Sequence, residues 1–350
     1  MEKGTIVSFF SVSSHPHSKY RNMESKRYFY LDLLRIIATF GVIFTHLSMD
    51  TNHWHIAIMY DGLVRWSVPI FVMISGTLFL NPCKELSIYM IIRKYVKRLL
   101  LAYLFWYLFY CVFKYLCIGF DSNSWELSNF SFTPRFHLWF LPMLMCIYLL
   151  IPILKKISGN KDLLLYALII WMFCLTFSFL NIKIPQVSGL FTMNQVAGYA
   201  GYFLLGYFLA TNSWVGRSRL IIYSLGILGV LATVLGSVFL SFHKGFFSAR
   251  FLLNVSPHVV LMASALFVFV KQHEPQLENR LGGFTRYVQK DLFGIYLVHV
   301  FWIKLFDCSF IWNSCNHVVL IPIMAIVVFL FSLYSTKLLR YVPFLSRFVR

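Results

Sequence analysis

Three polar side chains interrupt an otherwise apolar stretch near the start of the chain. Asp32, Arg35 and His46 lie within residues 28–49, among leucine, isoleucine, valine and phenylalanine. An imidazole titrates near neutral pH, so His46 suits proton abstraction from a hydroxyl or nucleophilic attack on an acyl group. Arg35 is permanently charged, and its planar donors suit a carboxylate or an oxyanion. Asp32 lies one helical turn from Arg35 and suits the task of holding its guanidinium.

The spacing of Arg35 and His46 predicts that both lie on one face of a helix. They are eleven positions apart, which at roughly 100° and 1.5 Å per residue gives a shared face and about 16 Å of separation in depth. Such groups are costly in lipid, so we expect them to face the interior of a helix bundle. The alternative is that Arg35 only pairs with Asp32 and that His46 reaches the outer membrane interface.

Composition excludes a soluble globular protein. The 350 residues are 59% hydrophobic and 13% charged, whereas soluble domains are about 45–50% apolar and about 25% charged. Stretches near the length that crosses about 30 Å of hydrocarbon occur ten times. They are residues 28–49, 62–82, 99–120, 136–154, 163–181, 196–211, 219–241, 250–271, 290–310 and 317–337.

The basic residues indicate an orientation. When the connections are assigned alternately to two sides, 23 Lys and Arg fall on one side and four on the other. The positive-inside rule makes the first side cytoplasmic, with both termini there. The net charge of +18 therefore records orientation and contact with membrane lipids, and nucleic-acid binding loses its support.

These patterns predict an all-α, polytopic integral membrane protein with ten spans. We expect a cytoplasmic tail over residues 1–27, a transmembrane domain over residues 28–337 and a second cytoplasmic tail over residues 338–350. The first apolar stretch contains Arg35 and lacks a small-residue cleavage site, so we expect a retained helix and not a signal peptide.

At this point the chain resembles the membrane acyltransferase type 3 family. Arg35 and His46 match its Arg-x10-His signature, and further segments occur in the same order as in that family. They are Ser-Val-Pro-Ile-Phe-Val-Met-Ile-Ser-Gly (67–76), the basic cluster at 93–98, His-Leu-Trp-Phe-Leu (137–141), Tyr-Phe-Leu-Leu-Gly-Tyr (202–207) and Gly-Ile-Tyr-Leu-Val-His (294–299).

The resemblance implies an O-acyltransferase of the bacterial inner membrane. Its donor would be cytoplasmic acyl-CoA, usually acetyl-CoA, and its acceptor a sugar hydroxyl of a surface polysaccharide or its lipid-linked precursor. His46 and Arg35 would then be catalytic, and the residues leave open whether His46 is a general base or an acyl carrier. Asp32 and His299 would support them.

Basic residues before the third span are candidates for binding coenzyme A. Arg93, Lys97 and Arg98 would lie at the cytoplasmic mouth, where phosphates can pair with them. Arg98 is the strongest candidate because it adjoins the span. The alternative for this cluster is a positive-inside anchor.

The start of the fourth span is a candidate acceptor site. His137 and Trp139 are expected near the outer face, where a sugar can stack on an aromatic ring. Their alternative is an interfacial aromatic belt.

The remaining charges and potential ligands carry weaker hypotheses. Arg65, Lys114 and Lys304 fall in the outer halves of their spans, and they either form structural ion pairs or bind an anionic sugar or lipid diphosphate. A structural role is favoured for Lys114. We expect no metal site, because His53 and His55 lack further ligands.

Two other hypotheses remain. Cys308 and Cys315 share the outer side, where a disulfide is compatible with their positions. The alternative function is a transporter or flippase for a lipid-linked sugar, because intramembrane charges also mark transport pathways.

Overall fold

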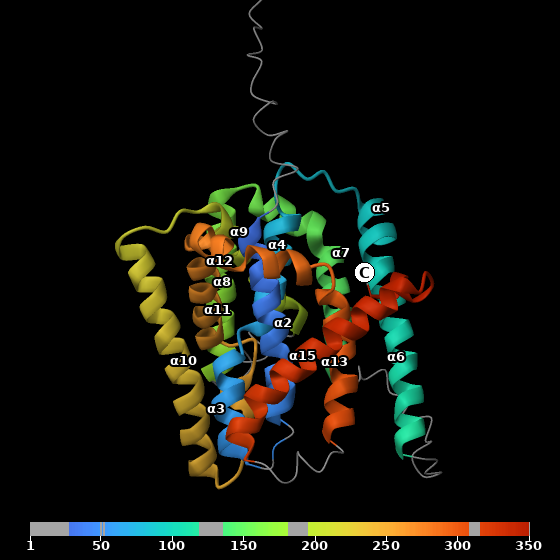
Figure 1. Cartoon of the computed structure of the whole chain (residues 1–350). Coiled ribbons are helices and arrows are strands. Elements are labelled where there is room, and N and C mark those ends of the chain that lie inside the picture. The colour runs from blue at the N-terminus through green and yellow to red at the C-terminus, as the bar shows by residue number, and fades with distance from the viewer. Residues whose placement is uncertain are drawn as a thin grey trace, which may run out of the picture.

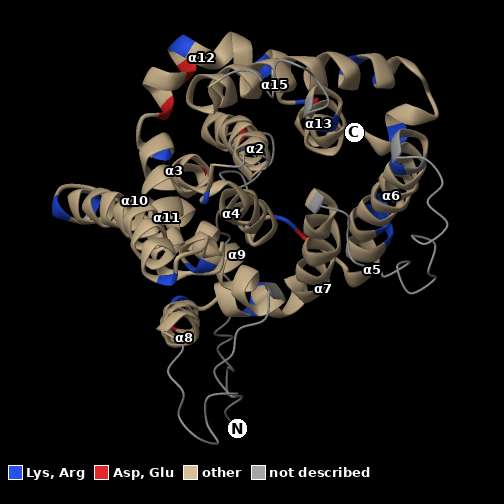
Figure 2. Cartoon of the chain, turned by 90° about the horizontal axis from the view of Figure 1, so that it is seen from below, with Lys and Arg blue, Asp and Glu red and all other residues tan. Residues whose placement is uncertain are grey.

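The computed structural model describes residues 28–49, 51, 53–118, 136–180, 195–307 and 316–349. Within these ranges it is helical nearly throughout and has no strand. Most helices stand side by side as a bundle (Figure 1), and α4 lies near its middle when the bundle is viewed from one end (Figure 2).

The first half of the chain forms α2 (Phe29–Met49), α3 (Trp54–Val64), α4 (Ser67–Phe79), α5 (Ile88–Met90), η1 (Ile91–Val96), α6 (Lys97–Ile118), η4 (Phe136–Trp139), α7 (Phe140–Ser158) and α8 (Lys161–Leu180). The second half forms α9 (Gln195–Thr211), α10 (Arg217–Lys244), η6 (Ala249–Leu252), α11 (Pro257–Gln272), α12 (Glu274–Val288), α13 (Leu292–Asp307), α15 (His317–Tyr341) and η7 (Leu345–Phe348).

The predicted all-α, multi-pass class is confirmed. In the described part of the chain, eight helices are long and apolar enough to cross a membrane. Two shorter apolar helices, Val196–Thr211 and Leu292–Phe306, coincide with the sixth and ninth predicted spans. Every predicted span therefore corresponds to an apolar helix.

The second predicted span begins earlier than expected and is broken. The prediction placed residues 50–61 in an outer loop, but α3 already begins at Trp54, and the helical course is interrupted at Arg65 and Trp66 before α4. Pro69 accounts for this break, because its nitrogen has no hydrogen to donate to the carbonyl of Arg65, four residues earlier. The break places Arg65 at the junction of two helical segments.

The third helical segment also begins earlier than predicted. Ser87 caps it, since its side chain accepts a hydrogen bond of 3.1 Å from the backbone N–H of Met90. Residues 91–96 form a π-helical turn. The basic cluster at 93–98 therefore lies on a helix and not on the loop that the sequence predicted.

An amphipathic helix occupies the predicted connection 271–290. Its charged and polar face explains why hydropathy missed it as a helix. Glu274, in the first turn of α12, accepts a 3.0 Å hydrogen bond from the backbone N–H of Tyr30 at the start of α2. This contact ties α12 to the helix that carries Arg35 and His46.

The bundle has two distinguishable ends. The connections at residues 80–87, 158–161, 212–216 and 272–274 lie together at the top of Figure 1, and we call this the basic end. The connection 245–256 lies at the opposite end, which we call the distal end.

Close packing of α4 on α9 requires glycine. A Cβ atom at Gly76 would overlap the backbone carbonyl of Phe203, and one at Gly206 would overlap the backbone of Met73. The two backbones can therefore approach closely only because these positions lack side chains.

The last residues pack against α6. The rings of Phe105 and Phe348 stack with centroids 4.3 Å apart, and the Trp106 indole donates a 3.1 Å hydrogen bond to the Phe348 carbonyl. The segment expected as a tail after residue 337 thus continues α15 to Tyr341 and then contacts the bundle.

Candidate active site

Three histidines from three helical segments meet inside the bundle. The ring centroid of His46 on α2 lies 5.3 Å from that of His299 on α13 and 6.2 Å from that of His137 on η4. The centroids of His137 and His299 are 4.9 Å apart. We call these residues the histidine cluster. Their positions in the sequence are far apart, and only the packing of α2, α13 and the start of α7 brings them together.

Burial differs within the histidine cluster. His137 and His299 are 2% and 0% exposed, whereas His46 is only partly buried. A reacting group must be reached by its substrate, and the two enclosed rings can hold it in place. His46 is therefore the member of the cluster best placed to react.

The tautomer of His299 follows from its backbone contact. Its Nδ1 lies 2.6 Å from the carbonyl oxygen of Tyr296. A carbonyl only accepts hydrogen bonds, so in the neutral ring Nδ1 carries the hydrogen and Nε2 is an acceptor. Nε2 is buried and has no hydrogen-bond partner among the described residues. An acceptor is thus available beside the ring of His46.

Two tyrosines hold the backbone around the histidine cluster. The Tyr296 hydroxyl donates to the carbonyl of His137, and the Tyr110 hydroxyl donates to the carbonyl of Leu297 at 2.7 Å. The first bond joins α13 to the segment that carries His137, and the second joins α6 to α13. These bonds limit the movement of His137 and His299 relative to each other.

A pocket of about 370 Å³ leads from the basic end toward the histidine cluster. Its charged lining residues are Arg35, Arg98 and Lys290. Arg98 and Lys290 are exposed, so the pocket opens at the basic end. We call it the basic pocket. Its volume lies within the range of about 300–1,000 Å³ that small-molecule sites occupy.

Tyr296 connects the basic pocket with the histidine cluster. It lines the pocket, and its ring centroid is 5.6 Å from that of His137 and 5.8 Å from that of His299. One aromatic ring therefore separates the inner wall of a cation-lined pocket from two of the buried imidazoles.

Arg35 and Asp32 form an ion pair, which was one of the two expectations for Arg35. Arg35 Nη1 donates to Asp32 Oδ1 at 2.9 Å. Asp32 is 7% exposed, so it anchors the guanidinium while Arg35 also lines the basic pocket. Arg35 and His46 thus belong to one continuous helix but to different parts of the site.

The three predicted coenzyme A ligands are placed differently. Arg98 lines the basic pocket, and its guanidinium lies 5.5 Å from the ring centroid of Phe293. Arg93 and Lys97 are exposed and do not line this pocket. The Arg93 guanidinium lies instead over the ring of Tyr89 at 4.9 Å. Lys290 also lines the pocket, together with Arg98. Lys290 was used in the sequence analysis only in counting the basic residues that set the orientation.

The two predicted acceptor residues also separate. His137 is enclosed in the histidine cluster. Trp139 is partly buried, and its ring lies 5.8 Å from that of Tyr199 on α9. Of the two, Trp139 is the one with surface left for contact.

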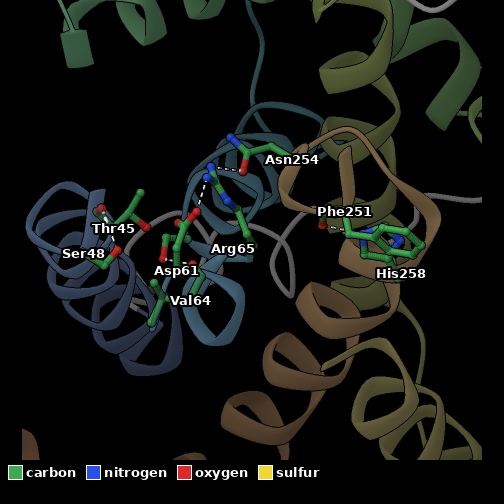
Figure 3. Close-up of polar contacts among 9 residues, drawn as sticks. Thr45, Ser48, Asp61, Val64, Arg65, Phe251, Asn254 and His258 are labelled. Carbon is green, nitrogen blue, oxygen red and sulfur yellow. Dashed lines mark hydrogen bonds and ion pairs between the residues drawn. The ribbon is translucent and has the colours of Figure 1, made fainter. Parts of the chain in front are cut away.

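The distal basic residues have distinct surroundings. Arg65 pairs with Asp61, one turn earlier on α3 (Figure 3), and Asp61 is 0% exposed. Sequence reasoning placed Asp61 in a loop, although its four-residue spacing from Arg65 was a helical pairing signal. Lys114 is exposed near the end of α6. Lys304 lies in the last turn of α13.

Among the residues that the structure describes, no group of three His, Cys, Asp or Glu side chains is arranged to hold a metal ion. His53, His55 and His317 lie together at the start of α3 and α15, with ring centroids 5.6 Å and 5.9 Å apart for the two pairs that share His53. Cys308 and Cys315, for which a disulfide was considered, lie outside the described residues.

Comparison with known proteins gives one match. A family model described as an acyltransferase domain, the type 3 model, matches residues 28–337. No curated protein and no solved structure matches the chain significantly. The matched range covers the histidine cluster, the basic pocket and the Asp61–Arg65 pair.

Proposed function

Because the chain belongs to the membrane acyltransferase type 3 family, we propose that this multi-pass membrane acyltransferase moves an acyl group, usually acetyl, from cytoplasmic acyl-CoA to a sugar hydroxyl. The acceptor is a surface polysaccharide or its lipid-linked precursor, and the enzyme resides in the bacterial inner membrane. The family match favours this chemistry over transport of a lipid-linked sugar.

The connection through Tyr296 is the observation that carries the proposal. Coenzyme A is polyanionic at one end and carries its thioester at the end of a slender arm. The basic pocket offers cations at its mouth, and Tyr296 lies both in its wall and against two members of the histidine cluster. A donor that binds its phosphates at Arg98 and Lys290 can therefore direct its thioester toward the histidines.

His46 is the general base in this proposal. In this proposal the ring N–H of His46 turns toward the unpartnered Nε2 of His299 when the acceptor binds, and the other nitrogen of His46 takes the proton of the sugar hydroxyl. The hydroxyl oxygen attacks the thioester carbonyl, the carbon–sulfur bond breaks, and the thiolate of coenzyme A receives the proton. His299 acts through His46 and is a positioning residue.

Arg35 supports the donor in this scheme. Its guanidinium is held by Asp32 and lines the basic pocket, where a permanent positive charge stabilises phosphate oxygens or negative charge on the donor. The same ion pair also contributes to folding, so loss of Arg35 alone does not isolate its chemical role.

The proposal is tested on the surface glycans of a strain that lacks the gene. Mass spectrometry should find the polysaccharide unchanged in amount and length but without acyl esters. The wild-type gene should restore the esters, and a His46→Ala gene that yields the same amount of membrane protein should not. Loss of exported polysaccharide with its esters intact would instead indicate transport.

A further inference from the structure

Three lysines gather beside the basic pocket, at the basic end of the bundle. Lys84 lies on the connection between α4 and α5, Lys94 on η1 and Lys155 near the end of α7. The connection 80–87 and the end of α7 lie together at the top of Figure 1. Among the described residues, no carboxylate forms an ion pair with any of the three, not even Glu85, which follows Lys84 in the sequence. We call these three residues the lysine cluster.

Backbone hydrogen bonds hold Lys84 in a defined place. Its N–H donates to the carbonyl of Asn81 at 3.1 Å, and the N–H of Cys83 donates to Asn81 Oδ1 at 3.0 Å. The Lys155 ammonium donates to the backbone carbonyl of Lys84, which ties the end of α7 to this connection. These bonds keep two positively charged side chains close together.

The Lys84 ammonium lies over aromatic rings. Its Nζ is 4.1 Å from the ring centroid of Phe79 and 5.3 Å from that of Tyr95. The Nζ of Lys94 lies 5.6 Å from the same Tyr95 centroid. Aromatic faces attract cations but leave their N–H groups able to bind a stronger acceptor. No described residue accepts a hydrogen bond from Lys84 Nζ, and the side chain is only partly buried.

The positive charges of the lysine cluster repel one another. Burial and the charges of Lys94 and Lys155 lower the pKa of Lys84 from its ordinary value. Each of these effects disfavours the cation, so the arrangement costs free energy while no anion neutralises it. Orientation in the membrane requires only that cations lie in the cytoplasmic connections, and not that they be partly buried close together. The lysine cluster therefore has the properties of an anion-binding site.

Tyr95 separates the lysine cluster from the basic pocket. Its ring lines the pocket, as Arg98 does, and the ammonium groups of Lys84 and Lys94 lie near the same ring. An anion at the lysine cluster is therefore outside the pocket but only one aromatic ring from its wall. A single ligand reaches both places if it carries two separate anionic groups.

Coenzyme A carries phosphate in two places. A diphosphate joins the pantetheine arm to the adenosine, and a separate monoester lies on the ribose. Such a monoester has about two negative charges near neutral pH, which suits a group of ammonium charges. We propose that the lysine cluster binds this ribose phosphate while Arg98 and Lys290 bind the diphosphate. This inference rests on the proposed function.

The inference is tested by isothermal titration calorimetry on the purified full-length protein in phosphatidylcholine nanodiscs. The two ligands are coenzyme A and dephospho-coenzyme A, which lacks only the ribose phosphate. The wild type should bind coenzyme A at least about tenfold more tightly, as expected for charge-assisted hydrogen bonds. Lys84→Gln and Lys94→Gln should each weaken binding of coenzyme A about fivefold, because solvent screens a partly exposed charge, and should leave binding of dephospho-coenzyme A unchanged.

Lys156→Gln is the matched control. Lys156 follows Lys155 in the sequence but is exposed at the end of α7, outside the lysine cluster. Its replacement should change either affinity by less than about twofold. Lys84→Gln removes a repelled charge and should not lower the melting temperature. If that variant does not fold, the exposed Lys94 still decides the result.

Anionic lipid is the other source of phosphate at this end of the bundle. The titrations are therefore repeated in nanodiscs that also contain phosphatidylglycerol. The preference of the wild type for coenzyme A should persist there. Its disappearance would show that lipid headgroups occupy the lysine cluster and would overturn the inference.

Three further results would overturn the inference. They are equal affinities of the wild type for the two ligands, equal weakening of both ligands by the lysine variants, and an effect of Lys156→Gln as large as that of Lys84→Gln. Equal affinities in a protein that still transfers acetyl groups would contradict this inference alone. Failure of the proposed function gives a different result: the wild type prefers coenzyme A but does not transfer acetyl from acetyl-CoA to the model acceptor methyl α-D-glucopyranoside.

Discussion

Replacing Arg98 by methionine should weaken binding of the acyl donor. Of the three basic residues that the sequence nominated for coenzyme A, Arg98 alone lines the basic pocket. A hydrogen bond to a charged group contributes about 1.5–3 kcal/mol. Arg98 is still exposed to solvent, so the lower end applies, and about 1.4 kcal/mol corresponds to a tenfold change in affinity. We expect the KM for acetyl-CoA to rise about tenfold.

The assay is steady-state release of free coenzyme A by protein in nanodiscs, with the acceptor glycoside held constant. Arg93→Met and Lys97→Met are matched controls, because they remove the same charge from the same helical segment outside the pocket. Exposed charges of this kind contribute little, so each control should change KM by less than about threefold. Equal effects of all three substitutions would show that the cluster acts as a diffuse anchor and would refute the assignment of Arg98.

Two further predictions concern positioning and packing. His299→Phe should lower kcat at least about tenfold with little change in the KM for acetyl-CoA. His299→Gln should recover part of kcat, because its amide oxygen can accept the N–H of His46. Equal losses of kcat in both variants would contradict a positioning role. Gly76→Ala should destabilise the protein by about 1–3 kcal/mol, because its Cβ would overlap the Phe203 carbonyl. Gly283→Ala has open space around the new Cβ and should not lower the melting temperature, so similar melting temperatures for the two variants would show that α4 and α9 are not closely packed.

Hydropathy predicted the helices well because the cost of exposing polar backbone to lipid leaves few alternatives to long apolar helices. Hydropathy failed to predict the helical segments that carry many polar residues. The amphipathic α12 looked like a loop because half of its surface is polar, and the basic residues before position 99 hid a helix that Ser87 caps at its start. In both places, helix capping and periodicity were better guides than mean hydropathy.

The candidate site was predictable only within one helix. The pairing of Asp32 with Arg35 follows from a three-residue spacing, and the structure contains it. The meeting of His46, His137 and His299 depends on which helices are neighbours, and no local pattern encodes that. For Arg65 the sequence left a structural ion pair open, with Asp61 among the acidic residues near the same face, and the structure contains that pair. Its helical spacing was missed because hydropathy began the second span at residue 62, directly after Asp61.

The central claim is that His46 catalyses acyl transfer in the histidine cluster, on the far side of the Tyr296 ring from the basic pocket. The most direct test is single-turnover transfer of a radiolabelled acetyl group from acetyl-CoA to methyl α-D-glucopyranoside by purified wild-type and His46→Ala proteins in nanodiscs. General-base catalysis contributes about 10²–10⁴-fold, so the variant should lose at least about a hundredfold in rate while it still binds acetyl-CoA and melts at the wild-type temperature. Transfer by the folded variant at the wild-type rate would contradict the account.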